Sequence, residues 1–119
     1  MDKKPLKGEV WLVNLEPARE GELGKSRRPC IIFQNNFASS LLNTITFIPL
    51  SSDIRQYNSI HVSLKPTKSN GLTKPSAALC SHLYTAVRGR LIKKIGLLSN
   101  SELKEVTDAV LLHLDIDIF

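Results

Sequence analysis

At residues 25–36 the chain reads Lys-Ser-Arg-Arg-Pro-Cys-Ile-Ile-Phe-Gln-Asn-Asn. A basic, polar segment runs into Pro29, an unbroken apolar run follows, and three amide side chains end the stretch. Such a run is typical of a strand that is buried on both faces. Because proline has no backbone N–H, we expect Pro29 to open this strand, which reaches Gln34, or to lie at its edge. The pattern predicts fixed cations at the mouth of a buried strand, where an anionic substrate could be bound.

Further short strands are predicted before and after this segment. Residues 8–15, 44–50 and 59–64 are rich in β-branched or aromatic side chains and are bounded by glycine, proline or polar residues. Residues 76–87 are mostly strand-like, whereas residues 88–96 fit either a short strand or a helical turn. The connection from Glu16 to Arg28 is charged and contains proline and glycine, so we expect an exposed loop.

The C-terminal part of the chain predicts a helix. Ser99 and Glu102 form a Ser-x-x-Glu capping box. The apolar residues that follow at helical spacing are Leu103, Val106, Val110 and Leu114. A short tail, residues 115–119, could add an edge strand. Several short strands followed by one helix predict a mainly β, α+β fold, a small antiparallel barrel or curled sheet with the helix at one end.

Length and composition indicate one globular domain, residues 1–119, with 42% hydrophobic residues to build a core. No apolar run approaches the roughly 20 residues that span a bilayer. No apolar segment of a secretory signal follows the basic N-terminus. We therefore expect a cytoplasmic protein without membrane contact, in which Cys30 and Cys80 are buried, reduced thiols.

The net charge of +5 favours an anionic partner. The sequence has no Gly-x-Ser-x-Gly elbow, no P-loop, and no Cys-x-x-Cys or His-x-x-x-His spacing, so we expect no metal site and no cofactor. A general base at neutral pH could be His61 or His82. The other polar residues that could grip or position an anionic substrate are Arg27, Arg28, Gln34, Asn36, Ser51 and Ser52.

These few polar residues would be enough to cleave RNA. Its 2′-OH can attack the neighbouring phosphodiester, so the site needs a proton acceptor, a proton donor and charge neutralisation, but no protein nucleophile and no metal. Guanidinium groups bind phosphate and stabilise charge that develops on it. A solvated basic face is nevertheless the commoner reason for two adjacent arginines in a loop, and the residues alone leave both explanations open.

The ordered set of segments resembles the MazF/PemK (Kid) toxins of bacterial type II toxin–antitoxin systems, over nearly the whole chain. The segments that carry the resemblance are Gly8–Pro17, Gly21–Pro29, Pro29–Asn35, Thr44–Ser51, His61-Val62, Gly71-Leu72, Arg90-Leu91, Ile95-Gly96 and the terminal helix. The resemblance implies an SH3-like barrel that works as a homodimer. It also implies a metal-independent, sequence-specific endoribonuclease that leaves 2′,3′-cyclic phosphate and 5′-OH ends on single-stranded RNA. A cognate MazE-like antitoxin would cover the RNA groove with an extended acidic segment.

Site residues carry over from the resemblance one at a time. Arg28, just before Pro29, matches the family arginine taken to assist proton transfer and stabilise the phosphate. Ser51 falls where many members have an active-site threonine or serine. Both are therefore expected to be catalytic. The other residues expected to contact RNA are Lys25, Arg27, Gln34, Asn36, Ser52, His61 and His82.

One segment departs from the family pattern. Where members often read Asp/Glu-Gln-Ile-Arg-Thr, this chain reads Ser81-His82-Leu83-Tyr84-Thr85. Some members place a catalytic carboxylate at the position that Ser81 holds here, so either His82 substitutes for it or activity is lost. Two alternatives therefore stay open: a non-catalytic CcdB-like toxin that poisons a protein such as gyrase, and a nucleic-acid-binding module without cleavage.

Overall fold

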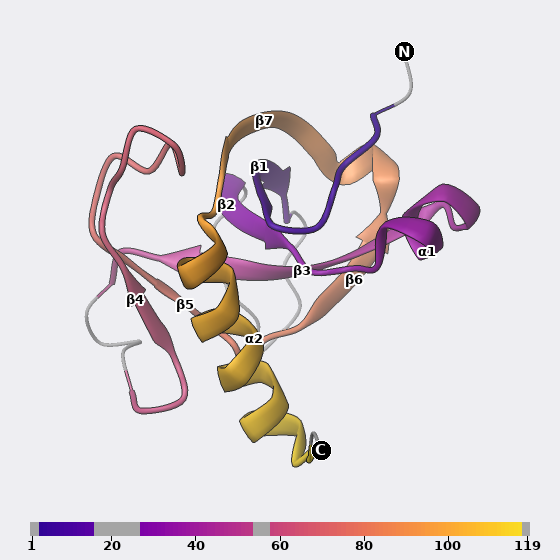
Figure 1. Ribbon diagram of the computed structural model, residues 1–119. Coiled ribbons are helices and arrows are strands. Elements are labelled where there is room, and N and C mark those ends of the chain that lie inside the picture. The colour runs from indigo at the N-terminus through magenta and orange to yellow at the C-terminus, as the bar shows by residue number, and fades with distance from the viewer. Residues whose placement is uncertain (1–2, 16–26, 54–57, 118–119) are drawn as a thin grey trace.

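The computed structural model describes residues 3–15, 27–53 and 58–117, which form one antiparallel sheet and two helices (Figure 1). The strands are β1 (Glu9–Asn14), β2 (Arg27–Ile32), β3 (Thr44–Ser51), β4 (Val62–Leu64), β5 (Ser76–Ala78), β6 (Tyr84–Val87) and β7 (Leu91–Leu97). The helices are α1 (Asn36–Leu41) and α2 (Asn100–Leu114), and a 3-10 turn, η2, covers Arg88–Arg90. No helix among these residues is long and apolar enough to cross a membrane.

The sheet has the strand order β4-β5-β3-β2-β1-β7, and β6 pairs with the first half of β3. β3 is the longest strand and joins β2, β5 and β6, so it runs through the middle of the molecule between α1 and β4 (Figure 1). The mainly β, α+β class is confirmed. Within the described residues the order ends at β4 and β7, so the sheet is curled rather than closed into a barrel.

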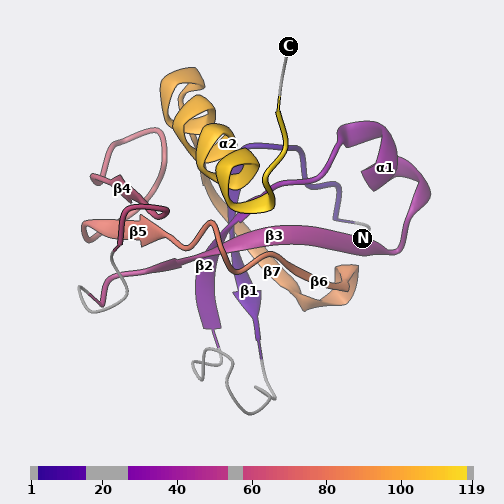
Figure 2. The same cartoon turned by 90° about the horizontal axis from the view of Figure 1, so that it is seen from below.

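Each face of the sheet carries its own apolar cluster, because successive strand residues point to opposite faces. One cluster contains Val10, Ile31 and Ile48 and includes Val106 and Val110 of α2. The other contains Trp11, Cys30 and Phe47, and Leu91 of β7 packs with them. Figure 2 shows α2 lying on one side of β3. The strand β2 is therefore buried on both faces, as its unbroken apolar run predicts.

The capping box of the C-terminal helix is confirmed. The Ser99 hydroxyl accepts from the Glu102 N–H at 3.1 Å, and Glu102 Oε1 accepts from the Ser99 N–H at 2.8 Å. Val106 and Val110 are buried, as the helical spacing predicts, but Leu114 is 46% exposed. The helix stops one residue later at Asp115, whose φ of 58° is left-handed, and residues 115–117 form no edge strand.

Pro29 is the third residue of β2, because β2 pairs with β1 from Arg27 onward. The ladder of β2 with β3 starts only at Cys30, so Pro29 lies at an edge, one of the two positions expected for it. Two other elements differ from the sequence prediction. Residues 36–41 form α1, capped by the Asn35 side chain, and this helix was not predicted. Phe37 and Leu41 lie four residues apart, but both are exposed, so they form no buried face. The 76–87 segment divides into β5 and β6, whereas residues 91–97 form a strand. Most of the predicted loop, residues 16–26 with Lys25, lies outside the described residues.

The connection between β4 and β5 is built around a buried asparagine. Asn70 is 0% exposed, and its Oδ1 accepts from the N–H groups of Thr67 and Leu72, both at 3.0 Å. The next residue, Gly71, has a φ of +71°, and a Cβ there would lie 1.9 Å from the Ile95 carbonyl oxygen. A side chain at residue 71 is therefore excluded by both backbone conformation and space.

Candidate active site

Arg28 and Ser51 lie on the same face of the sheet. Cys30 pairs with Pro49 and Ile31 with Ile48, so continuing this register by two residues sets Arg28 opposite Ser51. Arg28 Nη1 also donates to the Leu50 carbonyl oxygen at 2.9 Å, which joins the two strand ends directly. The register thus brings together the two residues that were predicted to be catalytic.

The Arg28 guanidinium is buried and only partly used by the protein. The side chain is 6% exposed, and Nε is buried without a hydrogen-bond partner in the described part of the chain. No carboxylate within residues 3–15, 27–53 and 58–117 forms an ion pair with it. Burial lowers the pKa of Arg28, partly offset by Cys30 and Tyr84, but arginine stays protonated at neutral pH. A buried cation with a spare N–H donor favours an anionic ligand.

Ser51 ends β3 and is 4% exposed. Its hydroxyl accepts from the Asp53 N–H at 3.1 Å. A hydroxyl carries one proton and two lone pairs, so this bond leaves the proton available to donate. Beside a guanidinium, such a donor can bind one oxygen of a phosphate group.

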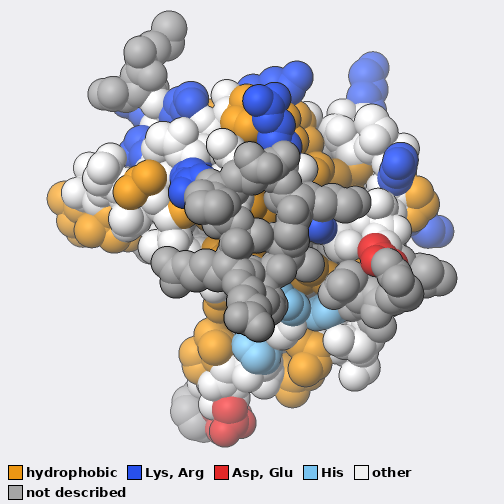
Figure 3. Space-filling model, turned by 180° about the vertical axis from the view of Figure 1, so that it is seen from behind, with side chains coloured by type: hydrophobic (Ala, Val, Ile, Leu, Met, Phe, Trp, Pro, Cys, Tyr) orange, Lys and Arg blue, Asp and Glu red, His pale blue; other side chains and the backbone are white. Residues whose placement is uncertain are grey.

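A histidine cluster lies near the same end of β3. His61 Nε2 is 3.0 Å from Ser81 Oγ, and Ser81 Oγ is 3.1 Å from His82 Nδ1. The two imidazole rings have centroids 6.1 Å apart. Burial lowers the pKa of His82, and the charges of His61, His113 and Arg28 lower it further. In Figure 3, histidine side chains gather on a face that also carries lysines and arginines.

Arg27 serves a different surface from Arg28. It precedes Arg28 in β2, and alternation along a strand points the two side chains to opposite faces. Arg27 is exposed and lines a cavity of about 410 Å³ together with Ser52, Lys74 and Lys93. This cavity also reaches Arg28 and Pro29, so a basic groove adjoins the buried arginine.

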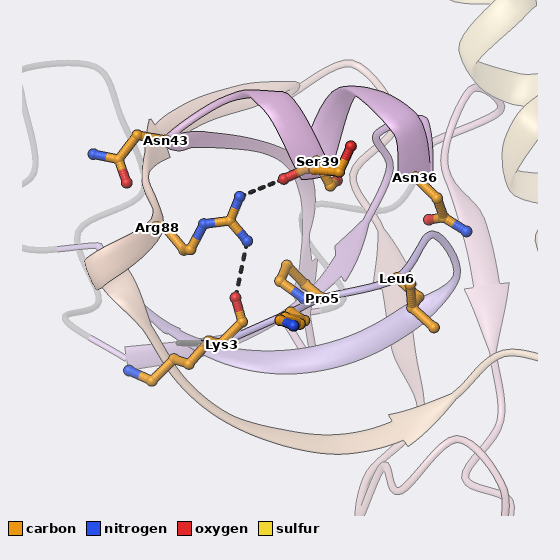
Figure 4. Close-up of a pocket in the computed structure, with 9 residues that line it drawn as sticks. Lys3, Pro5, Leu6, Asn36, Ser39, Asn43 and Arg88 are labelled. Carbon is orange, nitrogen blue, oxygen red and sulfur yellow. Dashed lines mark hydrogen bonds between the residues drawn. The ribbon is translucent and has the colours of Figure 1, made fainter. Parts of the chain in front are cut away.

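Gln34 and Asn36 do not join this site. The Gln34 amide donates to Ser39 Oγ and to the Thr44 carbonyl oxygen and accepts from the Thr46 N–H, so it holds the start of β3. Asn36 accepts from the Lys7 N–H and lines a separate cavity (Figure 4). That cavity lies at the Thr44 end of β3, and the eight-residue strand separates it from Ser51 by roughly 23 Å.

The separate cavity is organised by Arg88. Its Nη1 donates to the Lys3 carbonyl oxygen at 2.8 Å and its Nη2 to the Ser39 carbonyl oxygen (Figure 4). Nη2 also donates to the Leu42 carbonyl oxygen. Three backbone acceptors therefore hold this guanidinium, in contrast to Arg28. Arg88 therefore connects α1 and the N-terminal segment to the turn before β7 by hydrogen bonds.

The chemistry of the remaining candidates is simple. Cys30 and Cys80 are free and buried, as predicted. Burial raises the pKa of both thiols, that of Cys80 to about 11, so neither is a ready nucleophile.

Among the described residues, no group of three or more His, Cys, Asp or Glu side chains could hold a metal ion. The prediction did not include Ser81 among the site residues, although Ser81 lies in the segment that departs from the family pattern and contacts both histidines.

Comparison with known proteins decides the family. Residues 6–114 match the family described as PemK-like, MazF-like toxin of type II toxin–antitoxin system. This chain belongs to that family. Endoribonuclease MazF9 of Mycobacterium tuberculosis is 31% identical over 115 residues, 92% of this chain and 96% of the relative.

Solved structures of the family share the fold. MazF from Deinococcus radiodurans superposes with a TM-score of 0.80 at 20% identity, covering 97% of this chain and all of that one. An endoribonuclease in complex with its cognate antitoxin, from Mycobacterial species, has a TM-score of 0.74 at 16% identity, covering 98% and 99%. These likenesses confirm the predicted MazF-type fold.

The depressed pKa of His82 predicts a loss of stability in mild acid. Protonating His82 costs more free energy in the folded protein than in the unfolded chain, where a histidine has a pKa of about 6.5. The unfolded chain therefore binds more protons as the pH falls through that value, and the free energy of unfolding decreases. Urea unfolding at pH 7.5 and pH 5.5 measures this decrease, and we expect it to be smaller in His82→Gln. An equal decrease in the wild type and in His82→Gln would show that His82 does not cause the loss of stability in acid.

Proposed function

We propose that this toxin is an endoribonuclease that cleaves single-stranded RNA at one backbone phosphate held between Arg28 and Ser51. The observation that carries the proposal is the buried Arg28 guanidinium, whose Nε has no hydrogen-bond partner among the described residues, while Ser51 lies on the same face of the sheet. The named endoribonuclease at 31% identity supports the reaction class.

The reaction uses the nucleophile that RNA itself carries. The 2′-oxygen forms a bond to phosphorus, the bond from phosphorus to the 5′-oxygen breaks, and the products are a 2′,3′-cyclic phosphate and a 5′-OH. Negative charge builds on the non-bridging oxygens as the new bond forms. Arg28 donates from the Nη N–H groups that Leu50 does not use, and a donor held in a water-poor site stabilises that charge without reorganising.

Neighbouring surfaces bind the rest of the RNA. Arg27 and Ser52 line the basic cavity that adjoins Arg28, where they would hold a flanking phosphate or sugar. Lys25 precedes this strand in the sequence and would add a further positive charge, and His61 and His82 would contact the RNA from the cluster that they form with Ser81. Because these contacts are largely ionic, we expect RNA affinity to fall steeply with salt.

The proposed partners follow from the charge and from the family. An acidic, extended segment of a cognate MazE-like antitoxin would compete with RNA for the same basic groove. A related endoribonuclease has been solved with its cognate antitoxin, which supports this assignment. We further propose that the protein acts in the cytoplasm as a homodimer, where its RNA substrate is.

One experiment tests the function. Purified protein is incubated with a long single-stranded RNA in EDTA, and the ends of the products are mapped. We expect cuts at a short, recurring sequence with 2′,3′-cyclic phosphate ends. RNA that stays intact but is bound would indicate a nucleic-acid-binding module, and RNA that is neither cut nor bound would indicate a toxin aimed at a protein.

Ser51→Ala should weaken cleavage without abolishing it. A hydrogen bond to a charged group contributes about 1.5–3 kcal/mol, so kcat/KM is expected to fall about 10-fold to 100-fold. Ser52→Ala is the matched control, because that hydroxyl follows Ser51 in the chain and lines the basic cavity. Initial cleavage rates on one short RNA measure both. Equal effects of the two substitutions would remove Ser51 from the reacting phosphate.

A further inference from the structure

We propose that His61, Ser81 and His82 form a proton relay, in which Nε2 of His82 takes the proton from the attacking 2′-OH. The inference rests on the proposed RNA cleavage and names the general base for it. The position that carries a carboxylate in some family members is Ser81 here, and the structure joins that hydroxyl to two imidazoles.

The hydrogen-bond chemistry of Ser81 allows this role. Its hydroxyl has one proton, so it cannot donate to both imidazoles and must accept from one of them. When Ser81 donates to His61 Nε2, it accepts from the N–H at His82 Nδ1. A neutral His82 then carries its proton on Nδ1, and its Nε2 presents a lone pair. In this arrangement Ser81 fixes the tautomer that a general base needs.

The fold brings His82 to the reacting end of β3. The Leu79 N–H donates to the Pro49 carbonyl oxygen at 2.9 Å, and the His82 N–H donates back to the Leu79 carbonyl oxygen at 2.8 Å. This turn therefore lies against the last residues of the strand that ends in Ser51. Arg28 is among the charged groups that lower the pKa of His82, which agrees with the placement of His82 near this end of β3.

The electrostatic surroundings keep His82 neutral. The charged or titratable groups that act on it are His61 before β4, His113 on α2 and Arg28 on β2, and each disfavours the imidazolium, as burial does. A neutral imidazole at physiological pH is the form that accepts a proton. The same positive surroundings would attract the RNA phosphate, whose charge then offsets the imidazolium as it forms.

The proton balance closes with water alone. As the 2′-oxygen bonds to phosphorus, its proton moves to His82 Nε2. The Nδ1 proton of His82 passes to Ser81 Oγ while the Ser81 proton passes to His61 Nε2, which leaves the positive charge on the more distant imidazole. His61 then releases its proton to water, and the departing 5′-oxygen takes one from water. His82 is the catalytic residue in this scheme, and Ser81 and His61 are positioning residues.

The test compares pH profiles of kcat/KM on a short RNA. Wild-type cleavage should fall with decreasing pH, with an inflection below about 6.5, because His82 must be neutral. His82→Gln should lower kcat/KM about 100-fold and remove this inflection. Ser81→Ala should move it and lower the rate, and Ser81→Thr should restore both. His113→Gln removes one of the charges that lower the pKa of His82, so it should move the inflection to higher pH and leave the rate above the inflection unchanged.

A substrate with a sulfur in place of the bridging 5′-oxygen separates base from acid. A thiolate leaves without protonation, so the His82→Gln defect should persist if His82 acts on the 2′-OH. Recovery of the wild-type rate on this substrate would make His82 an acid and overturn the proposal, as would an unchanged rate and profile of His82→Gln on ordinary RNA. Wild-type protein that cuts no RNA would instead reject the proposed function itself.

Discussion

Arg28→Met is expected to lower kcat/KM for RNA cleavage about 1,000-fold while leaving the free energy of unfolding within about 1 kcal/mol of wild type. The loss of activity follows because methionine has no N–H to donate and no positive charge to stabilise the negative charge that builds on the phosphate oxygens. Removing one preorganised donor at a developing oxyanion costs about 100-fold to 1,000-fold, and here the charge is lost as well.

The small effect on stability has its own cause. Arg28 is 6% exposed, forms no ion pair among the described residues and leaves Nε unpartnered, so the folded protein carries an uncompensated desolvation cost. Methionine fills a similar volume without that cost, although the Leu50 carbonyl oxygen loses its donor. The two terms oppose each other, which is what a residue kept for binding rather than for folding should show.

Arg27→Met is the matched control for this result. It changes the same residue type one position earlier, on the opposite face of β2, and Arg27 is exposed. We expect a rise in KM relative to wild type that is largest at low salt and shrinks as salt is added, with a nearly unchanged kcat. Urea unfolding and single-turnover cleavage of one RNA measure both variants. The site assignment fails if Arg28→Met cleaves at the wild-type rate, or if Arg27→Met loses as much kcat as Arg28→Met.

The parts of the fold that could be predicted from the sequence are those set by residues close together in the chain. The helix α2 was predictable because its cap and its apolar face are both local features, from Ser99 with Glu102 to Val106 and Val110. The buried strand β2 was predictable because an unbroken apolar run fits few other structures. The helix α1 was not predictable, because its only local signal is the Asn35 cap. Its other support is the pair of hydrogen bonds from Arg88, which lies far away in the sequence.

The site follows the same division. Arg28 and Ser51 could be named from their places beside Pro29 and at the end of a predicted strand. The convergence of His61 with His82 could not, because it depends on the turn after β5 and on a serine between them. Gln34, which is expected to contact RNA, makes three hydrogen bonds at the start of β3, and these distant partners could not be read from the sequence.

Asn70→Ala should lower the free energy of unfolding by about 3–5 kcal/mol, the largest stability effect that we expect. The side chain is 0% exposed and makes four hydrogen bonds. Its Oδ1 accepts from two backbone N–H groups, and its Nδ2 donates to the Lys65 carbonyl oxygen at 2.9 Å and to Glu102 Oε2 at 3.0 Å. Alanine replaces none of these partners, and a buried polar group left without one costs about 1–3 kcal/mol.

The damage should spread along two connections. Glu102 also forms the capping box with Ser99, so freeing its second oxygen loosens the first turn of α2, which hydrogen exchange would detect as faster exchange there. Gly71 and Leu72 line the basic cavity beside Arg28, so RNA affinity should fall together with stability. Asn36→Ala is the matched control, because that asparagine is exposed and its side chain accepts, within the described part of the chain, only from the Lys7 N–H. Its effect should stay below about 1 kcal/mol. Thermal and urea unfolding of both variants decide the matter, and a loss in Asn70→Ala no greater than in Asn36→Ala would show that the loop does not depend on this side chain.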